Sequence, residues 1–145
     1  MGLSVPAFIK GLNELTLHNN ASMIMQHMYQ VKENAMSTGE ESFIIFTAGS
    51  DRYILKSQDK IKFYYLQPGI KVVGTNFPAD PARKYVVGRS ACCFVCTGAP
   101  TQGGTVVLED QLGHRLYIPV TPCLGSIRIS HDPPEDWITW QKKYK

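Results

Sequence analysis

The chain has 145 residues, a net charge of +3, 43% hydrophobic residues and 19% charged residues. This composition is typical of one folded domain with its own hydrophobic core, and it excludes an intrinsically disordered chain. The small net charge does not require a nucleic-acid or anionic-lipid partner. No run of 18 apolar residues occurs in the sequence, so we expect no membrane-spanning helix and a single domain over residues 1–145.

The first 40 residues contain two segments in which apolar residues are spaced as in a helix. Apolar residues recur at helical intervals within residues 5–18, and Ser4 is a suitable N-cap. Asn19-Asn20 interrupts this pattern and can cap a second helix, which runs to about Met36 and ends before Gly39. We therefore expect two N-terminal helices, the second with one apolar face made of Ile24, Met28, Val31 and Ala35.

From Ser42 onward the sequence changes to short β-rich runs separated by turn residues. A short helix is expected after Pro133-Pro134, with Trp137 and Trp140 on one face that docks on the sheet. The predicted fold class is α+β: two N-terminal helices, a mostly antiparallel β-sandwich or barrel, and a short C-terminal helix. The expected strands cover residues 43–48, 52–56, 60–66, 70–73, 85–87, 91–97, 105–109, 115–120 and 126–130.

The four cysteines bear on the cellular compartment and on chemistry. Three of them, Cys92, Cys93 and Cys96, are close together, and Cys123 is the fourth. A disulfide framework has more widely spread cysteines, so we expect reduced thiols. Residues 1–6 lack the basic and apolar regions of a secretion signal. We therefore expect the protein to be cytoplasmic, or to be exported by a signal-independent route.

A thiol and an imidazole could meet near the ends of two predicted strands. Residues 91–97 and 105–109 are separated by a Gly-rich and Pro-rich loop and can pair as a hairpin, which would bring Cys92 toward His114. A cysteine needs such a base to be a thiolate near neutral pH, and Asp110 or Glu109 could orient the imidazole. The alternative is that Cys92 is a small buried hydrophobic side chain.

The segment Ser90-Ala91-Cys92 together with His114 resembles the cysteine glutamine deamidases of the cytotoxic necrotizing factor type and the related chemoreceptor deamidases. Those proteins place a Ser-x-Cys segment at a strand start and a histidine on the next strand of a β-sandwich. The resemblance implies a cysteine amidohydrolase that acts on protein glutamine side chains, with Cys92 as nucleophile and His114 as general base.

A metal site is a further hypothesis. Cys93 and Cys96 form a C-x-x-C pair, and Cys123 with either His114 or His131 could complete a four-ligand zinc site. Residues three apart in a strand point to opposite faces, which weakens this hypothesis. We expect no cofactor.

The run Lys60–Tyr65 combines lysines and aromatic residues. Strand alternation places Lys60, Lys62 and Tyr64 on one face and the apolar residues of the run on the other. With Lys56, this face could hold single-stranded nucleic acid, or it could be an ordinary solvated strand face. Because no strong catalytic pattern is present, the leading hypothesis is a binding module without chemistry of its own that contacts another protein.

Overall fold

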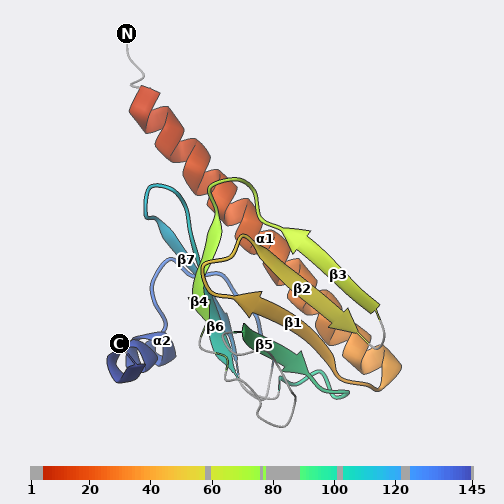
Figure 1. Cartoon of the computed structure of the whole chain (residues 1–145). Coiled ribbons are helices and arrows are strands. Elements are labelled where there is room, and N and C mark those ends of the chain that lie inside the picture. The colour runs from red at the N-terminus through yellow and green to blue at the C-terminus, as the bar shows by residue number, and fades with distance from the viewer. Residues whose placement is uncertain are drawn as a thin grey trace.

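The computed structural model describes residues 5–57, 60–75, 77, 89–100, 103–121 and 125–144. A long helix α1 (Val5–Thr38) is followed by two antiparallel sheets and a short helix α2 (Glu135–Tyr144). Figure 1 shows both sheets on one side of α1, with the N-terminal part of the helix extending beyond them. The α+β class, the antiparallel strands and the short C-terminal helix are confirmed.

The described strands form a four-stranded and a three-stranded sheet, which adjoin at the turn between β1 and β2. There the Gly49 N–H donates to the Val72 carbonyl at 2.6 Å, and the Val72 N–H donates to the Ser50 carbonyl at 2.9 Å. The strand order across the four-stranded sheet is β3 (Lys60–Tyr65), β2 (Arg52–Ser57), β1 (Ser42–Thr47) and β5 (Arg89–Phe94). The order across the three-stranded sheet is β4 (Lys71–Thr75), β6 (Gly104–Glu109) and β7 (Arg115–Val120).

One face of α1 supplies the helical side of the core. Its buried apolar residues recur at alternating intervals of four and three, so they form a single stripe along the helix. The stripe packs against β1, β2 and β5 of one sheet and β6 and β7 of the other, so α1 holds the two sheets together. The buried stripe consists of Leu17, Ala21, Ile24, Met28, Val31 and Ala35.

The prediction of two N-terminal helices is wrong, because α1 continues through Asn19-Asn20. The Asn20 amide is buried and donates to the Thr16 carbonyl at 2.7 Å and to Gln67 Oε1 at 3.0 Å. Its Oδ1 accepts the Gln67 N–H at 3.1 Å. Since Thr16 of the same helix and the distant Gln67 together satisfy the polar groups of this side chain, Asn20 has no need to cap a helix end.

Of the two predicted arrangements, sandwich or barrel, the closed barrel is wrong, because the described strands divide between two sheets that share a helix instead of continuing one ladder. The predicted strand 126–130 is only partly formed, through isolated bridges of Ile127 to Val120 and of Ser130 to Tyr117. The predicted strand 85–87 lies outside the described residues.

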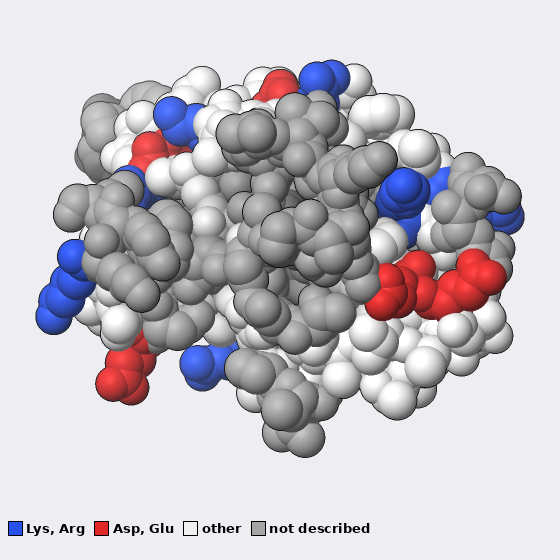
Figure 2. Space-filling model, turned by 60° about the horizontal axis from the view of Figure 1, so that its bottom comes forward, with Lys and Arg blue, Asp and Glu red and all other residues white. Residues whose placement is uncertain are grey.

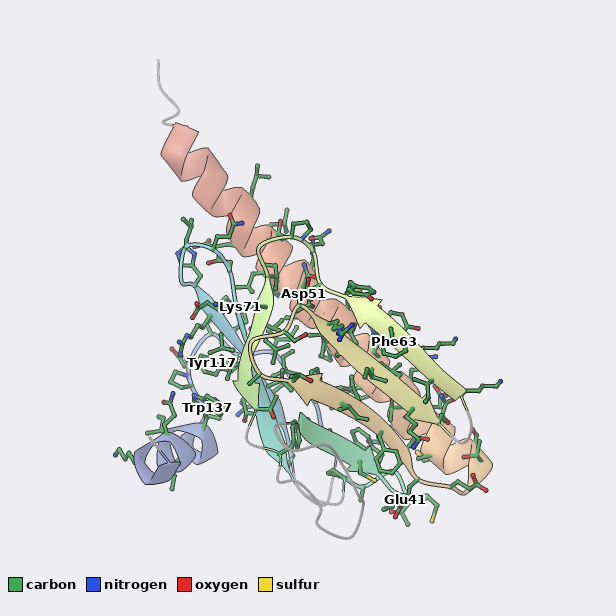
Figure 3. The ribbon with its side chains drawn as sticks, in the orientation of Figure 1. Glu41, Asp51, Phe63, Lys71, Tyr117 and Trp137 are labelled. Carbon is green, nitrogen blue, oxygen red and sulfur yellow. The ribbon has the colours of Figure 1, made fainter. Side chains whose placement is uncertain are left out.

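Helix α2 covers the other face of the three-stranded sheet. Trp137 is buried against Val107 and Tyr117, and Figure 3 shows it directed from α2 toward the sheet beside Tyr117. Gly74 lies at an irregularity of β4, where an added Cβ would be 3.4 Å from the Trp137 ring. The predicted docking is therefore confirmed for Trp137, whereas the Trp140 side chain is outside the description.

Candidate functional site: a projecting helix and an open strand edge

Cys92 lies on β5 opposite Ile44, and its side chain is completely buried in the core between the sheet and α1. Burial, followed by the neighbouring Cys93, raises the pKa of the Cys92 thiol well above its ordinary value. The thiol therefore stays protonated near neutral pH, which is the behaviour of a small core side chain and the opposite of an activated nucleophile.

The predicted hairpin of residues 91–97 with 105–109 is wrong. Strand β5 pairs with β1, whereas β6 pairs with β4 and β7 in the other sheet. A tight turn follows β5, in which the Gly98 N–H donates to the Val95 carbonyl at 2.8 Å and Phe94 bridges to Pro100. The chain thus reverses within a few residues and continues into the second sheet. For this reason β5 and β6 do not pair with each other, although they are close in sequence.

His114 and Asp110 do meet, in the turn between β6 and β7. Buried Asp110 accepts the N–H groups of Leu112 and His114 through Oδ1, each at 2.9 Å, and its Oδ2 is 3.0 Å from His114 Nδ1. Figure 1 shows this turn well away from β5. The observed contacts make Asp110 a residue that stabilises the turn, and the deamidase hypothesis for Cys92, His114 and Asp110 stays a prediction.

Alkylation of the thiols tests that prediction. We expect iodoacetamide at a pH of about 7.5 to modify exposed Cys96 rapidly, and to modify buried Cys92 and Cys93 only when the protein unfolds. Peptide mass spectrometry over time measures each site. Rapid labelling of Cys92 that is lost in His114→Ala would instead support catalysis.

The zinc hypothesis gains no support from the described residues, among which no group of three metal-binding side chains is found. Cys93 is buried and Cys96 is exposed, while Cys123 lies outside the description. His114 is engaged with Asp110, and His131 is exposed in the segment that precedes α2.

The two faces of β3 are arranged as the sequence predicted, but Lys56 of β2 lies opposite Ile61 and so does not share the face of Lys60 and Lys62. Lys60, Lys62 and Tyr64 lie opposite Ser57, Leu55 and Tyr53 on the face toward α1. Tyr64 is half-buried, with its ring centroid 4.0 Å from that of His27 and 5.7 Å from that of Tyr53. Tyr64 is thus occupied by protein rings and is no free platform for stacking a base.

The remaining features also fail to support nucleic-acid binding. The exposed aromatic side chains of β3 are on the face away from Lys60 and Lys62, so the lysines and the stacking surfaces are separated. On the side seen in Figure 2, the positive side chains of the described residues are scattered, while some acidic side chains lie together at the right, so no continuous basic area is seen on this side.

The surroundings of His27 predict that the stability of the protein depends on pH. Its Nδ1 is 2.5 Å from the Tyr53 hydroxyl, and burial, followed by the positive charge of Lys62, lowers the pKa of His27. Burial also raises the pKa of Tyr53, so the hydroxyl stays protonated beside the imidazole. The unfolded chain, with His27 near its ordinary pKa of 6.5, then binds the proton more readily than the folded chain.

We therefore expect the free energy of unfolding to decrease as the pH falls from about 7.5 through the ordinary histidine range. In the variant His27→Gln, the altered hydrogen bond should lower the free energy of unfolding by about 1 kcal/mol at a pH of about 7.5. The further decrease of this free energy toward a pH of about 5.5 should be smaller in the variant than in the original protein. Urea unfolding at several pH values measures both effects. An unchanged slope in the variant would assign the pH dependence to other groups.

The outer edge of β3 is open in the part of the chain that the structure describes. β3 ends the four-stranded sheet, and its side chains Ile61, Phe63 and Tyr65 are 54%, 55% and 61% exposed. On the opposite face of the strand is a groove of about 270 Å³, whose lining includes Lys60 and Lys62 together with residues of α1. A row of exposed apolar side chains and a basic groove thus flank one strand edge.

The second exposed feature is the part of α1 that precedes the buried Leu17, which we call the projecting end of α1. Leu12 and Leu15 are 46% and 57% exposed. At roughly 100° per residue, Leu15 lies about 160° around the helix from Leu17, the first residue of the buried stripe. Leu12 and Leu15 therefore do not continue the stripe that packs on the sheets, and both are exposed.

Comparisons with known proteins identify the fold. No family model matches the sequence, and no curated protein matches it. Two solved structures of the minor pseudopilin EpsH from the type 2 secretion system of Vibrio cholerae are similar in fold, with TM-scores of 0.58 and 0.60 and sequence identities of 11% and 9%. The similarity covers 79% and 86% of this chain and 95% and 99% of those chains.

The chain therefore has a minor-pseudopilin-like fold, in which a long helix is combined with antiparallel sheets. None of the helices that the structure describes is both long enough and apolar enough to span a membrane.

Proposed function

We propose that this chain is a subunit of a secretion-type protein assembly and acts by binding other proteins rather than by catalysis. The observation that carries the proposal is the projecting end of α1, where Leu12 and Leu15 are exposed on a side that the sheets do not cover. Exposed leucines in succession on a helix are typical of a surface that packs against another protein.

The fold supports the same proposal. EpsH, which has a similar fold at low sequence identity, is a component of a secretion system. Buried Cys92 and the engagement of His114 in a turn agree better with binding than with a deamidase. Of the two locations that the sequence left open, this proposal favours the exported one.

Site-specific photo-crosslinking tests the proposal. A photo-reactive residue is placed at position 12 or 15 of the full chain in its native cells, and crosslinked proteins are identified by mass spectrometry. We expect at least about ten-fold more adduct with a protein partner than from position 19 or 26, which are also exposed on α1. The added charge in Leu12→Asp or Leu15→Asp should abolish the same adduct.

The control positions 19 and 26 are necessary because any exposed residue gives some background. Asn19→Asp and Gln26→Asp place the same charge on the same helix outside the projecting end, and both should leave the adduct unchanged. Equal adduct from all four positions, or an adduct that survives Leu12→Asp and Leu15→Asp, would contradict binding through the projecting end of α1.

A further inference from the structure

The backbone of β3 offers hydrogen bonds on its open edge. Leu66 N–H donates to the Asp51 carbonyl at 2.7 Å, which continues the pairing of β3 with β2. In an antiparallel ladder, alternate residues direct both backbone groups to the same neighbour. Because Leu66 faces β2, the backbone groups of Ile61, Phe63 and Tyr65 point the other way, toward the open edge.

The same three residues present their side chains on the exposed face of the sheet. Ile61, Phe63 and Tyr65 lie opposite Lys56, Ile54 and Arg52 on the face away from α1. Natural edge strands usually carry charges or prolines that discourage pairing. Here more than half of each of these apolar side chains is exposed, so this edge combines free backbone groups with an apolar surface.

The other face of the strand is basic. Lys60 and Lys62 are exposed, and no ion pair of either with a described acidic residue is found. Among the described residues that line the adjoining groove none is acidic. An extended segment that carries carboxylates on this side would therefore be attracted to it.

From these observations we infer that β3 binds an extended segment of a partner protein, which adds to the sheet as a further strand and alternates acidic with apolar residues. The apolar residues of the segment lie over Ile61, Phe63 and Tyr65, and their backbone groups bond to the open edge. The acidic residues lie beside Lys60 and Lys62. This inference rests on the proposed function, because it assumes a protein partner, and it names the chemistry of that partner.

The positive charge of Lys62 favours an acidic segment over a second copy of the chain as the partner of β3. Two β3 strands joined antiparallel at their open edges, with Phe63 facing Phe63, would bring Lys62 of each copy onto one face in neighbouring positions. The two Lys62 charges are then diagonal neighbours on adjacent strands and repel each other. A segment with carboxylates at the same positions replaces this repulsion by attraction.

Binding of short capped peptides tests the inference by titration with NMR detection on the full chain. The probe peptide alternates valine and glutamate, and the reference peptide has lysine in place of glutamate. We expect the glutamate peptide to bind at least about ten-fold more tightly at low salt, and to protect the amide hydrogens of Ile61, Phe63 and Tyr65 from exchange. The double variant Lys60→Glu with Lys62→Glu should reverse the preference.

Methylation of the peptide backbone tests strand addition without altering the protein. N-methyl groups on the valines remove the hydrogens that would bond to β3, so this peptide should not bind, whereas N-methyl groups on the glutamates should be tolerated. In the protein, Phe63→Pro removes one N–H that points to the open edge, so it should weaken binding more than Phe63→Ala. The variant should still fold, because proline is tolerated on the open side of an edge strand.

Several outcomes would overturn the inference. Equal affinity for the glutamate and lysine peptides, protection that is absent from Ile61, Phe63 and Tyr65, or dimerisation of the chain through β3 would each exclude the proposed segment. Tighter binding of a single-stranded oligonucleotide to the lysine face would do the same. The crosslinks from positions 12 and 15 do not depend on β3, so failure here is distinguishable from failure of the proposed function.

Discussion

Replacing Trp137 by alanine is expected to lower the free energy of unfolding by about 3–5 kcal/mol, which is a large fraction of the stability of an ordinary domain. The Trp137 side chain is 2% exposed and packs against Val107, Tyr117 and Val73 of the three-stranded sheet. Alanine removes most of this buried apolar surface and leaves a cavity beside Gly74. Urea unfolding followed by circular dichroism measures the loss.

The effect of Trp137→Ala should come from lost packing between α2 and the sheet. Trp137→Phe keeps an aromatic ring at the same place and should cost clearly less, whereas Lys142→Ala alters an exposed residue of α2 and should stay within about 0.5 kcal/mol of the original protein. Hydrogen exchange should show faster exchange in α2 and β6. A loss below about 1 kcal/mol in Trp137→Ala would mean that α2 contributes little to the folded domain.

Ile24→Ala is expected to lower the free energy of unfolding by about 2–5 kcal/mol. The Ile24 side chain is completely buried in the middle of the α1 stripe, which packs on both sheets. Truncation to alanine therefore removes contacts that hold the sheets to one helix. Alanine has the higher helix propensity, so the expected loss comes from packing and not from the helix itself.

Leu15→Ala is the matched control on the same helix. Leu15 is 57% exposed on the projecting end of α1, so its truncation should change the free energy of unfolding by no more than about 0.5 kcal/mol. The same substitution should weaken the crosslinks expected from the projecting end. If Leu15→Ala destabilised the isolated chain as much as Ile24→Ala, the projecting end would be part of the core and not a free surface.

The local pattern of the sequence determined most of the secondary structure. Turn residues separated the β-rich runs, and the predicted strand 115–120 coincides with β7 (Arg115–Val120). Alternation along the chain was sufficient to assign Lys60, Lys62 and Tyr64 to one face of a strand, and the pairing of β3 with β2 confirms this assignment. These features depend on neighbours within a few residues, which is the range over which periodicity and turn propensities act.

The continuity of α1 was decided by the tertiary structure. Asn19-Asn20 has the local character of a helix boundary, but Gln67, which is distant in sequence, satisfies the Asn20 side chain and allows the helix to continue. The exposed position of Leu12 and Leu15 could have been inferred from the change of apolar face after residue 15, but the Asn-Asn pair suggested two separate helices instead. A distant contact outweighed a local preference here.

The position of the cysteine segment was likewise decided by the tertiary structure. Nothing within residues 91–109 specifies that β5 pairs with β1 while β6 joins the other sheet, because strand partners are set by which faces can be buried together. The sequence by itself determined the elements, the faces of β3 and the presence of a hydrophobic core. Only the tertiary structure decided that Cys92 is buried away from the His114 turn and that β3 is left at an open edge, because both depend on contacts between segments far apart in the chain.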